Sequence, residues 1–257
     1  MKIVFWNIKG SKDVTHVVDL VDSVEPDLLF LAECSPEIVA SSQSRCRVIA
    51  PRIFANPKVR GFVVSENVKC TLSLEHNDRL FFYRVTWQGK EFLLGTVHLL
   101  SKIYASNSAQ SSEAQKYVRV VRMTEKAEKQ KNTILIGDFN MNPFEEGMVK
   151  VHAFNSVCSS EIALKKGRQF QGEYYDYFFN PAWKHYAGVG NGVYGTYYHH
   201  SCGADGFHWN NFDQALVSPS ILQKYNPQFS ILHDVLGFDL RNKNNGVSDH
   251  YPILLEL

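Results

Sequence analysis

Short apolar runs alternate with polar turns along the chain, and several of these runs end in a polar residue. Residues 3–6 and 28–32 are continuous apolar runs, the pattern of buried strands. Between them, valines recur at helical spacing and predict an amphipathic helix over about residues 12–24. A strand, a helix and a second strand of these lengths indicate a crossover unit, which would place Asn7 and Glu33 side by side at one end of a sheet. Taken alone, Glu33 is better explained as a strand-end carboxylate in a surface ion pair.

The middle of the chain predicts further strands and one long helix. Residues 47–50, 60–65, 68–74, 80–87 and 92–97 read as strands joined by short loops, and we expect them to form an antiparallel meander. The last of these strands ends in His98, which taken alone is most simply a satisfied core histidine. Ser111 or Ser112 is predicted to cap a helix that runs to about residue 130, with one apolar and one charged face.

Residues 133–143 carry the clearest chemical signal. An apolar strand over residues 134–136 is followed by Gly137, which lets the backbone come close to another group. Asp138 and Asn140 are two residues apart on an extended chain and therefore share a face. A carboxylate and an amide beside an apolar sheet need a partner, and a metal ion or a phosphate ester would serve. A simple loop cap is the alternative.

The segment from residue 159 to 211 is the least regular part of the sequence. It holds a basic cluster, Lys165, Lys166 and Arg168, and many aromatic residues interleaved with glycines, among them Tyr197 and Trp209. Aromatic residues near basic ones could stack bases along a nucleic-acid groove, and an aromatic-packed loop explains the pattern equally well. Histidines at 185, 199, 200 and 208 lie here with Cys202, but their spacing matches no zinc pattern, so we expect no zinc site.

The rest of the chain supplies shorter elements and two more polar strand ends. We expect a short helix near residue 145 and strands over residues 152–158, 212–218, 229–232 and 253–257. Asp213 lies near the start of one of these strands, and Ser218 followed by proline predicts a helix start. The triplet Ser248, Asp249 and His250 stands just before the last strand, an unusual choice for a plain loop.

Composition narrows the class of protein without deciding its function. The chain has 257 residues, 44% of them hydrophobic and 21% charged, which is ordinary for a globular protein, and we treat it as one domain over residues 1–257. The net charge of +1 requires any polyanion binding to come from a local patch. No apolar run reaches transmembrane length, and residues 2–6 already read as a strand, so we expect no secretory signal and no membrane partner. Five scattered cysteines without a C-x-x-C pair indicate reduced thiols, a cytoplasmic location and no metal site built on sulfur.

The polar strand ends, taken in order, resemble the motifs of a known family. Trp6-Asn7, Leu31-Ala-Glu33, Thr96-Val-His98, Gly137-Asp-Phe-Asn140, Phe212-Asp213 and Ser248-Asp-His250 are similar to the successive motifs of the exonuclease–endonuclease–phosphatase superfamily, which includes deoxyribonuclease I and exonuclease III. The six motifs appear in the family's order and span nearly the whole chain. The resemblance implies an α+β fold, a four-layer α/β/β/α sandwich with two mixed sheets packed face to face.

The resemblance also implies a role for each of these residues. Glu33 would be the main ligand of Mg²⁺ or Mn²⁺, helped by Asn7 and Asp249, and oxygen ligands suit such hard cations. Asp213 would orient His250 and hold it as an imidazolium, and His98 would be a second cationic donor to the phosphate. Asp138 and Asn140 would position or activate the attacking water, with either Asp138 or His250 as the general base. Some branches carry an acidic residue where this chain has Lys9, which weakens the case for a second carboxylate ligand there.

The function implied is a divalent-metal-dependent phosphodiesterase, with a nuclease that hydrolyses DNA as the favoured form. Lys165, Lys166, Arg168, Tyr197 and Trp209 are the candidate substrate-binding residues, with DNA as the expected partner. Two alternatives stay open. One is a phosphoesterase that acts on a phospholipid, a phosphoinositide or a small phosphoester, and the other is a non-catalytic nucleic-acid-binding module on the same fold.

Overall fold

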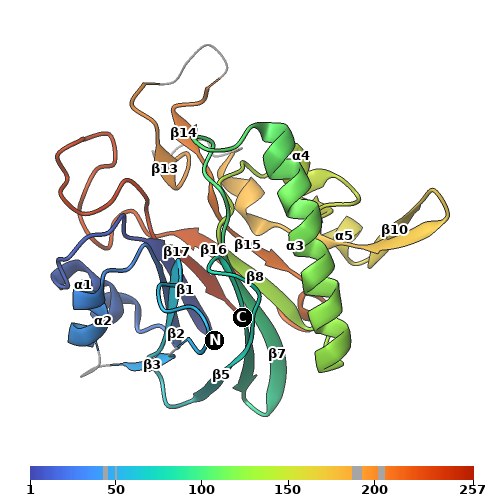
Figure 1. Cartoon of the computed structure of the whole chain (residues 1–257), viewed down its shortest axis with the longest axis horizontal. Coiled ribbons are helices and arrows are strands. Elements are labelled where there is room, and N and C mark those ends of the chain that lie inside the picture. Colours follow the sequence, from blue (N-terminus) through green and yellow to red (C-terminus); the bar gives the residue numbers. More distant parts are fainter. Residues whose placement is uncertain (43–45, 50, 187–192, 202–205) are drawn as a thin grey trace.

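Two large mixed β-sheets make up the centre of the molecule (Figure 1). The computed structural model describes residues 1–42, 46–49, 51–186, 193–201 and 206–257. The first sheet has the strand order β16-β17-β1-β2-β4-β3 and consists of β1 (Lys2–Asn7), β2 (Leu28–Ala32), β3 (Arg47–Ile49), β4 (Val59–Val63), β16 (Gln228–Ile231) and β17 (Ile253–Glu256). The second has the order β5-β6-β7-β8-β15-β12-β9 and consists of β5 (Val68–Glu75), β6 (Leu80–Trp87), β7 (Lys90–His98), β8 (Thr133–Asp138), β9 (Ser156–Val157), β12 (Phe178–Phe179) and β15 (Asp213–Val217).

Helices and two small hairpin-like sheets surround this centre. The helices are α1 (Thr15–Val24), α2 (Pro36–Ser42), α3 (Asn107–Glu128), α4 (Glu146–Val149), α5 (Ser160–Ala163), α6 (Pro219–Leu222) and the 3₁₀ helix η1 (Pro181–His185). The small sheets pair β10 (Gly167–Phe170) with β11 (Glu173–Asp176), and β13 (Tyr197–Tyr198) with β14 (Trp209–Asn210). None of the described helices combines the length and the apolar content needed to cross a bilayer.

Alternating side chains along the strands produce four layers. In β1, Ile3 and Phe5 point inward and belong to the same buried cluster as Phe81 and Ile134 of the second sheet. Val4 and Trp6, which alternate with them, point outward and pack with the apolar side of α1. On the other side of the molecule, α3 packs its own apolar face on the second sheet. The predicted α/β/β/α sandwich is confirmed, with α1 and α2 on one side and α3 on the other (Figure 1).

Several predicted elements need correction. β1 and β2 are parallel neighbours joined by α1, as predicted, but the expected meander is divided. β3 and β4 belong to the first sheet and only β5, β6 and β7 form a meander in the second. The long helix begins earlier than predicted, because Ser106 accepts a hydrogen bond from the Ala109 backbone N–H and caps it. Helix α2 was not predicted, and of residues 152–158 only Ser156–Val157 is a strand.

Candidate active site

The ends of six strands meet at one edge of the sandwich and carry the polar residues there. Asn7 is the last residue of β1, and Glu33 follows the last residue of the parallel neighbour β2. In the second sheet, His98 ends β7 and lies in register with Asp138, the last residue of the parallel strand β8. Strand β15 runs in the opposite direction and starts at Asp213, which is in register with Asp138. The carboxyl ends of parallel strands share an edge, which is why these residues come together.

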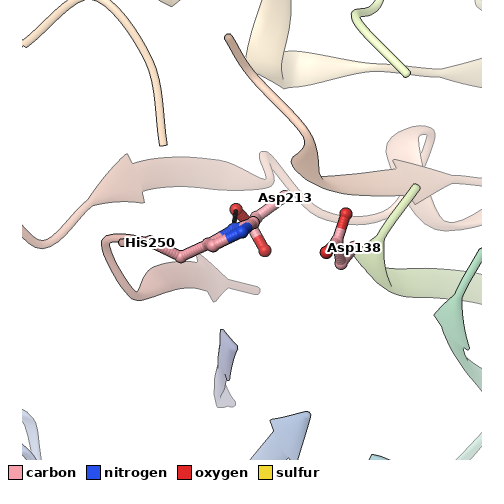
Figure 2. A group of neighbouring side chains, drawn as sticks. All are labelled: Asp138, Asp213 and His250. Atoms are coloured by element: carbon pink, nitrogen blue, oxygen red, sulfur yellow. Dashed lines mark hydrogen bonds and ion pairs between the residues drawn. The ribbon is translucent and has the colours of Figure 1, made fainter. Parts of the chain in front are cut away.

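His250 reaches from the first sheet to the second. It lies in the turn before β17, and its Nδ1 lies 2.7 Å from Oδ2 of Asp213, with Asp138 on the far side of Asp213 (Figure 2). The turn is fixed by buried hydrogen bonds: the His250 backbone N–H donates to Ser248 Oγ at 3.0 Å, and Trp6 Nε1 donates to the His250 carbonyl at 2.9 Å. Ser248 Oγ in turn donates to the Asn7 carbonyl at 2.5 Å. The polar triplet before the last strand therefore holds the imidazole in one orientation.

The protonation of His250 follows from its acidic neighbours. Burial alone would lower the pKa of this imidazole, but the negative charges of Asp213, Asp138 and Asp249 and the hydrogen bond to Asp213 outweigh burial and raise the pKa to about 10. His250 is therefore an imidazolium at neutral pH. Its Nδ1–H faces Asp213, which leaves Nε2–H for another acceptor.

Burial acts in the opposite direction on two other groups. It raises the pKa of Asp138 to about 7, together with the nearby charge of Asp213. It also lowers the pKa of His98 to about 4, although the charge of Glu33 partly opposes this. Nε2 of His98 lies 3.6 Å from Glu33 Oε1 and 3.7 Å from Asp138 Oδ2. These surroundings favour a neutral imidazole at His98, whereas the sequence predicted two cationic histidines.

The predicted metal ligands lie together on the side of the first sheet. Asn7 Nδ2 lies 3.4 Å from Glu33 Oε1 and donates to Asp138 Oδ2 at 3.2 Å, which links the two sheets. Asp249 Oδ1 lies 4.0 Å from Nε2 of His250. The other oxygen of Asp249 pairs with the ammonium of Lys9 at 2.8 Å.

The chemistry of the donor set fits a divalent cation. Glu33 and Asp249 are partly exposed carboxylates on one cavity, and a cation, Lys9, already contacts one of them. Oxygen donors of this kind suit Mg²⁺ or Mn²⁺. A second group of possible ligands is Asp138, Asp213 and His250, whose donor atoms lie within 4.8 Å of one another. An imidazolium has no lone pair to offer, so this second group would have to lose a proton before it bound an ion through His250.

A cavity of about 420 Å³ opens over these residues. It is lined by all eight of the predicted catalytic and metal residues except the fully buried Asp213, namely Asn7, Glu33, His98, Asp138, Asn140, Asp249 and His250. Asn140 is held there by its side-chain amide, which donates to the Leu99 carbonyl at 3.0 Å. The rim is more apolar than expected, because Ile103 is 84% exposed and Phe207 is 54% exposed.

The predicted substrate-binding residues divide into two groups. Tyr197 lines the cavity, and its ring lies 4.8 Å from the ring of His250. Trp209 packs on Tyr198 and does not line the cavity. Lys165 and Lys166 lie between α5 and β10, Arg168 lies in β10 of the β10–β11 hairpin, and none of them lines the cavity. In Figure 1 this hairpin extends away from β13 and β14, so the structure does not bring the basic cluster to the cavity.

Some residues of the cavity escaped the sequence analysis. Ser101, Lys102 and Ile103 form a wall of it, and their signal was only their position just after the strand that ends in His98. Two of the histidines considered for zinc make other contacts: Nδ1 of His208 lies 2.9 Å from the His199 carbonyl oxygen, and the ring of His185 packs against Phe229. Cys202 lies outside the described residues. Among those residues, the group of acidic and histidine side chains close enough to share a metal is the one at Asp138, Asp213 and His250.

Comparison with known proteins gives a clear result for the fold. No protein-family model matches the chain, and no curated protein matches it. Solved structures do match along its whole length. Truncated TDP2 from Caenorhabditis elegans is 17% identical with a TM-score of 0.59, over 99% of this chain and 95% of that one. TDP2 from D. rerio, solved with a single-strand DNA product, is 18% identical with a TM-score of 0.57, over 99% of this chain and 97% of that one.

A third solved structure carries the family's own description. It is an endonuclease/exonuclease/phosphatase family protein from Bacteroides thetaiotaomicron, 13% identical, with a TM-score of 0.61 over 99% of this chain and 96% of that one. Identities this low establish the fold alone, and the four layers of the chain agree with them. With its two packed mixed sheets, this chain has the same fold as that endonuclease/exonuclease/phosphatase family protein.

Proposed function

We propose that the protein is a divalent-metal-dependent phosphodiesterase that hydrolyses nucleic acid, with DNA as the favoured substrate. One observation carries the proposal: carboxylates, amides and imidazoles from five strand ends line one cavity, with an imidazolium held by a buried carboxylate at the end of a sixth strand. Such a set is costly to assemble for stability alone, because buried charges are favourable only when they are paired. The D. rerio neighbour with a single-strand DNA product supports nucleic acid as the substrate class.

In this mechanism His250 supplies positive charge to the reacting phosphate. Asp213 holds Nδ1, so the proton on Nε2 points to a group in the cavity, where it would donate to a non-bridging oxygen as negative charge develops. Tyr197 packs beside the ring and limits its rotation. Asp249 lies 4.0 Å from the same Nε2, and its negative charge helps to raise the pKa of His250, which keeps the proton on the ring.

Asp138 is placed to take a proton from the attacking water. Its raised pKa makes it a stronger base than an ordinary aspartate, and Asn7 and the backbone N–H of Asn140 fix its two oxygens at 3.2 and 2.8 Å. His98, as a neutral imidazole, would donate one hydrogen bond to the phosphate. Glu33 and Asp249, with Asn7 beside them, would hold the divalent ion, which supplies Lewis-acid stabilisation of the phosphate when it is bound.

The test is a metal and substrate panel with one informative variant. Purified protein is incubated with Mg²⁺ or Mn²⁺ and DNA, RNA, bis(4-nitrophenyl) phosphate or phospholipid vesicles. We expect cleavage of nucleic acid that EDTA abolishes and that Glu33→Gln lowers by at least about 100-fold, the size typical of removing one electrostatic interaction from the transition state. Glu37→Gln is the matched control, because Glu37 is an exposed glutamate of α2 that pairs with Lys12 and does not line the cavity.

The same panel separates the alternatives. Hydrolysis of phospholipid or small phosphoesters but not of nucleic acid would keep the chemistry and change the substrate. Binding of nucleic acid in EDTA without cleavage under either ion would point to a non-catalytic module and overturn the proposal.

A further inference from the structure

A second hollow of about 390 Å³ lies beside the cavity and shares a wall with it. Glu33, His98 and Ser101 line both. The other lining residues come from the segment leading from β2 into α2, from β4 and the segment before it, from the turn between β5 and β6, and from the loop after β7. Three of these residues are basic: Lys58, Arg60 and Arg79.

The three basic side chains gather without carboxylate partners. Within the described parts of the chain, none of them lies within 4.0 Å of an acidic oxygen, whereas Arg84 pairs with Glu128 and Lys102 with Glu145. The carboxylate that lines the hollow is Glu33, which we assign to the metal. Nε of Arg60 is buried without a hydrogen-bond partner among the described residues. Like charges held together at this density indicate a site for an anion.

The frame of the hollow is tied to the catalytic strands. The Glu33 backbone N–H donates to the Lys58 carbonyl at 3.0 Å, and the His98 backbone N–H donates to the Arg79 carbonyl at 3.0 Å. The guanidinium of Arg79 donates back to the His98 carbonyl at 3.1 Å. The backbone at Lys58 and the guanidinium of Arg79 therefore have a fixed position relative to Glu33 and His98, and an anion bound there would be preorganised relative to the reacting group.

We propose that this hollow binds a second phosphate group of the same nucleic-acid strand, next to the phosphate that is hydrolysed. The inference rests on the proposed function and gives it a substrate class: a strand with at least one flanking phosphate, as opposed to an isolated phosphodiester. Two guanidinium groups and an ammonium group match phosphate oxygens in charge and in hydrogen-bond donors. Because Glu33, His98 and Ser101 line both hollows, neighbouring phosphates of one strand could occupy both.

The first experiment compares two substrates that differ in flanking phosphates. kcat/KM is measured for a short single-stranded oligodeoxynucleotide and for bis(4-nitrophenyl) phosphate, with the native protein, Lys58→Gln, Arg60→Gln and the double variant. We expect each substitution to lower kcat/KM on the oligonucleotide by roughly tenfold, the scale of one hydrogen bond to a charged group, and to affect the small diester far less. Lys90→Gln is the matched control, because Lys90 is exposed at the opposite end of β7 from His98.

The outcomes are distinct. Equal losses on both substrates, or no loss on the oligonucleotide, would overturn the proposal. A soluble inositol bisphosphate is assayed beside these two substrates; a larger loss on it than on the oligonucleotide would assign the hollow to a polyphosphorylated small molecule and would also overturn the proposal. Arg60 is half-buried in β4, so its variant is checked for folding by circular dichroism, while the exposed Lys58 keeps the test decisive in any case.

The second experiment does not depend on turnover. Binding of a fluorescein-labelled oligonucleotide is followed by anisotropy in EDTA over a series of salt concentrations. We expect the slope of log affinity against log salt to become shallower by about 0.7 for each phosphate that a variant no longer neutralises. If the native protein binds with the expected slope but cleaves nothing, the proposed function fails while the phosphate site stands. If the variants keep the native slope, the site fails.

Discussion

Lys9 places an ammonium group against a proposed metal ligand. Its Nζ lies 2.8 Å from Asp249 Oδ2, and its side chain is 61% exposed, so the pair is largely screened by water. A fixed positive charge beside a ligand competes with a divalent cation for the same oxygen. We expect Lys9→Gln to tighten Mn²⁺ binding by roughly two- to fivefold, the size typical of an exposed ion pair.

Isothermal titration calorimetry at constant ionic strength measures this change. Lys12→Gln is the control, since Lys12 carries the same charge and pairs with Glu37 away from the cavity. An unchanged affinity in Lys9→Gln would show that the ammonium does not compete with the ion, and a weaker one would show that it supports the ion's binding site.

Glu75 holds a loop next to the basic hollow by hydrogen bonds, and its ionisation makes the free energy of unfolding depend on pH. Its buried carboxylate accepts hydrogen bonds from the backbone N–H groups of Arg52, Ile53 and Phe54. Burial raises the pKa of Glu75, but these three hydrogen bonds outweigh burial and leave the pKa below its usual 4.5. A lowered folded-state pKa means that the stabilisation is fully present above pH 4.5 and is lost as the pH falls through the folded value.

Glu75→Gln should therefore cost about 2 kcal/mol near neutral pH and progressively less in acid. Urea unfolding across acidic and neutral pH measures the difference, with the exposed Glu66→Gln as the control. A deficit that stays constant down to strongly acidic pH would mean that the ionised carboxylate is not what holds the loop.

At the scale of strands and helices, local patterns predicted the strand ends well and sheet membership poorly. Asn7, His98 and Asp138 could be placed at strand ends because apolar runs stop there, and their convergence follows from parallel neighbours. The division of the meander could not be read, because β4 joins the first sheet through pairing with the distant strand β2, in which Leu28 faces Val63. That pairing depends on which apolar faces meet in the core, and period-two alternation is the same in either sheet.

The sequence did not predict the start of α3 or the basic hollow, for two different reasons. Residues 107–110 are three polar residues and an alanine, so the first turn of the helix has no apolar periodicity and the capping role of Ser106 was missed. Lys58 and Arg60 lie together at the start of β4, but Arg79 comes from the turn between β5 and β6, and only the fold brings it near them. The basic cluster that is contiguous in sequence, around Lys166, is the one that lies away from the cavity.

Gly137 lies in β8 and allows this strand to approach its parallel neighbour β7 closely at the active site. It has φ of +155°, and a Cβ at this position would lie 2.0 Å from the Val97 carbonyl oxygen, far inside contact distance. Val97 faces Gly137 in the register, and the next pair is His98 and Asp138. Any added side chain must push the strands apart where both residues are held.

Gly137→Ala is therefore expected to destabilise the protein by about 3 kcal/mol or more and to reduce hydrolysis at least 100-fold. Thermal unfolding and the DNA assay measure the two effects. Gly89→Ala, in the β6–β7 turn, is the comparison, because a Cβ there meets no atom within 4 Å. Its positive φ of +70° costs some stability but leaves the cavity untouched. Native activity in Gly137→Ala would show that the close approach of the strands is not needed for the site.

Across the whole molecule, the site joins the two sheets. The first sheet and its adjoining turns supply Asn7, Glu33 and Asp249, and the second supplies His98, Asp138 and Asp213. Contacts at the site cross between them, from His250 to Asp213, from Asn7 to Asp138 and from Glu33 to His98. An ion held by the first group therefore rests on residues whose positions depend on the packing of both sheets, so metal binding and global stability should be coupled.

This coupling gives a prediction that needs no substrate. A divalent ion that binds only the folded protein adds about 2.7 kcal/mol of stability at a hundred times its Kd, which corresponds to a rise in Tm of roughly 5–10 °C for a domain of this size. Differential scanning fluorimetry with increasing Mn²⁺ measures the shift. Glu33→Gln and Asp249→Asn should remove most of it, and Glu37→Gln should keep it. Loss of the shift in Asp213→Asn together with its retention in Glu33→Gln would move the ion to the buried group of Asp138, Asp213 and His250, where binding would have to displace the proton of the imidazolium.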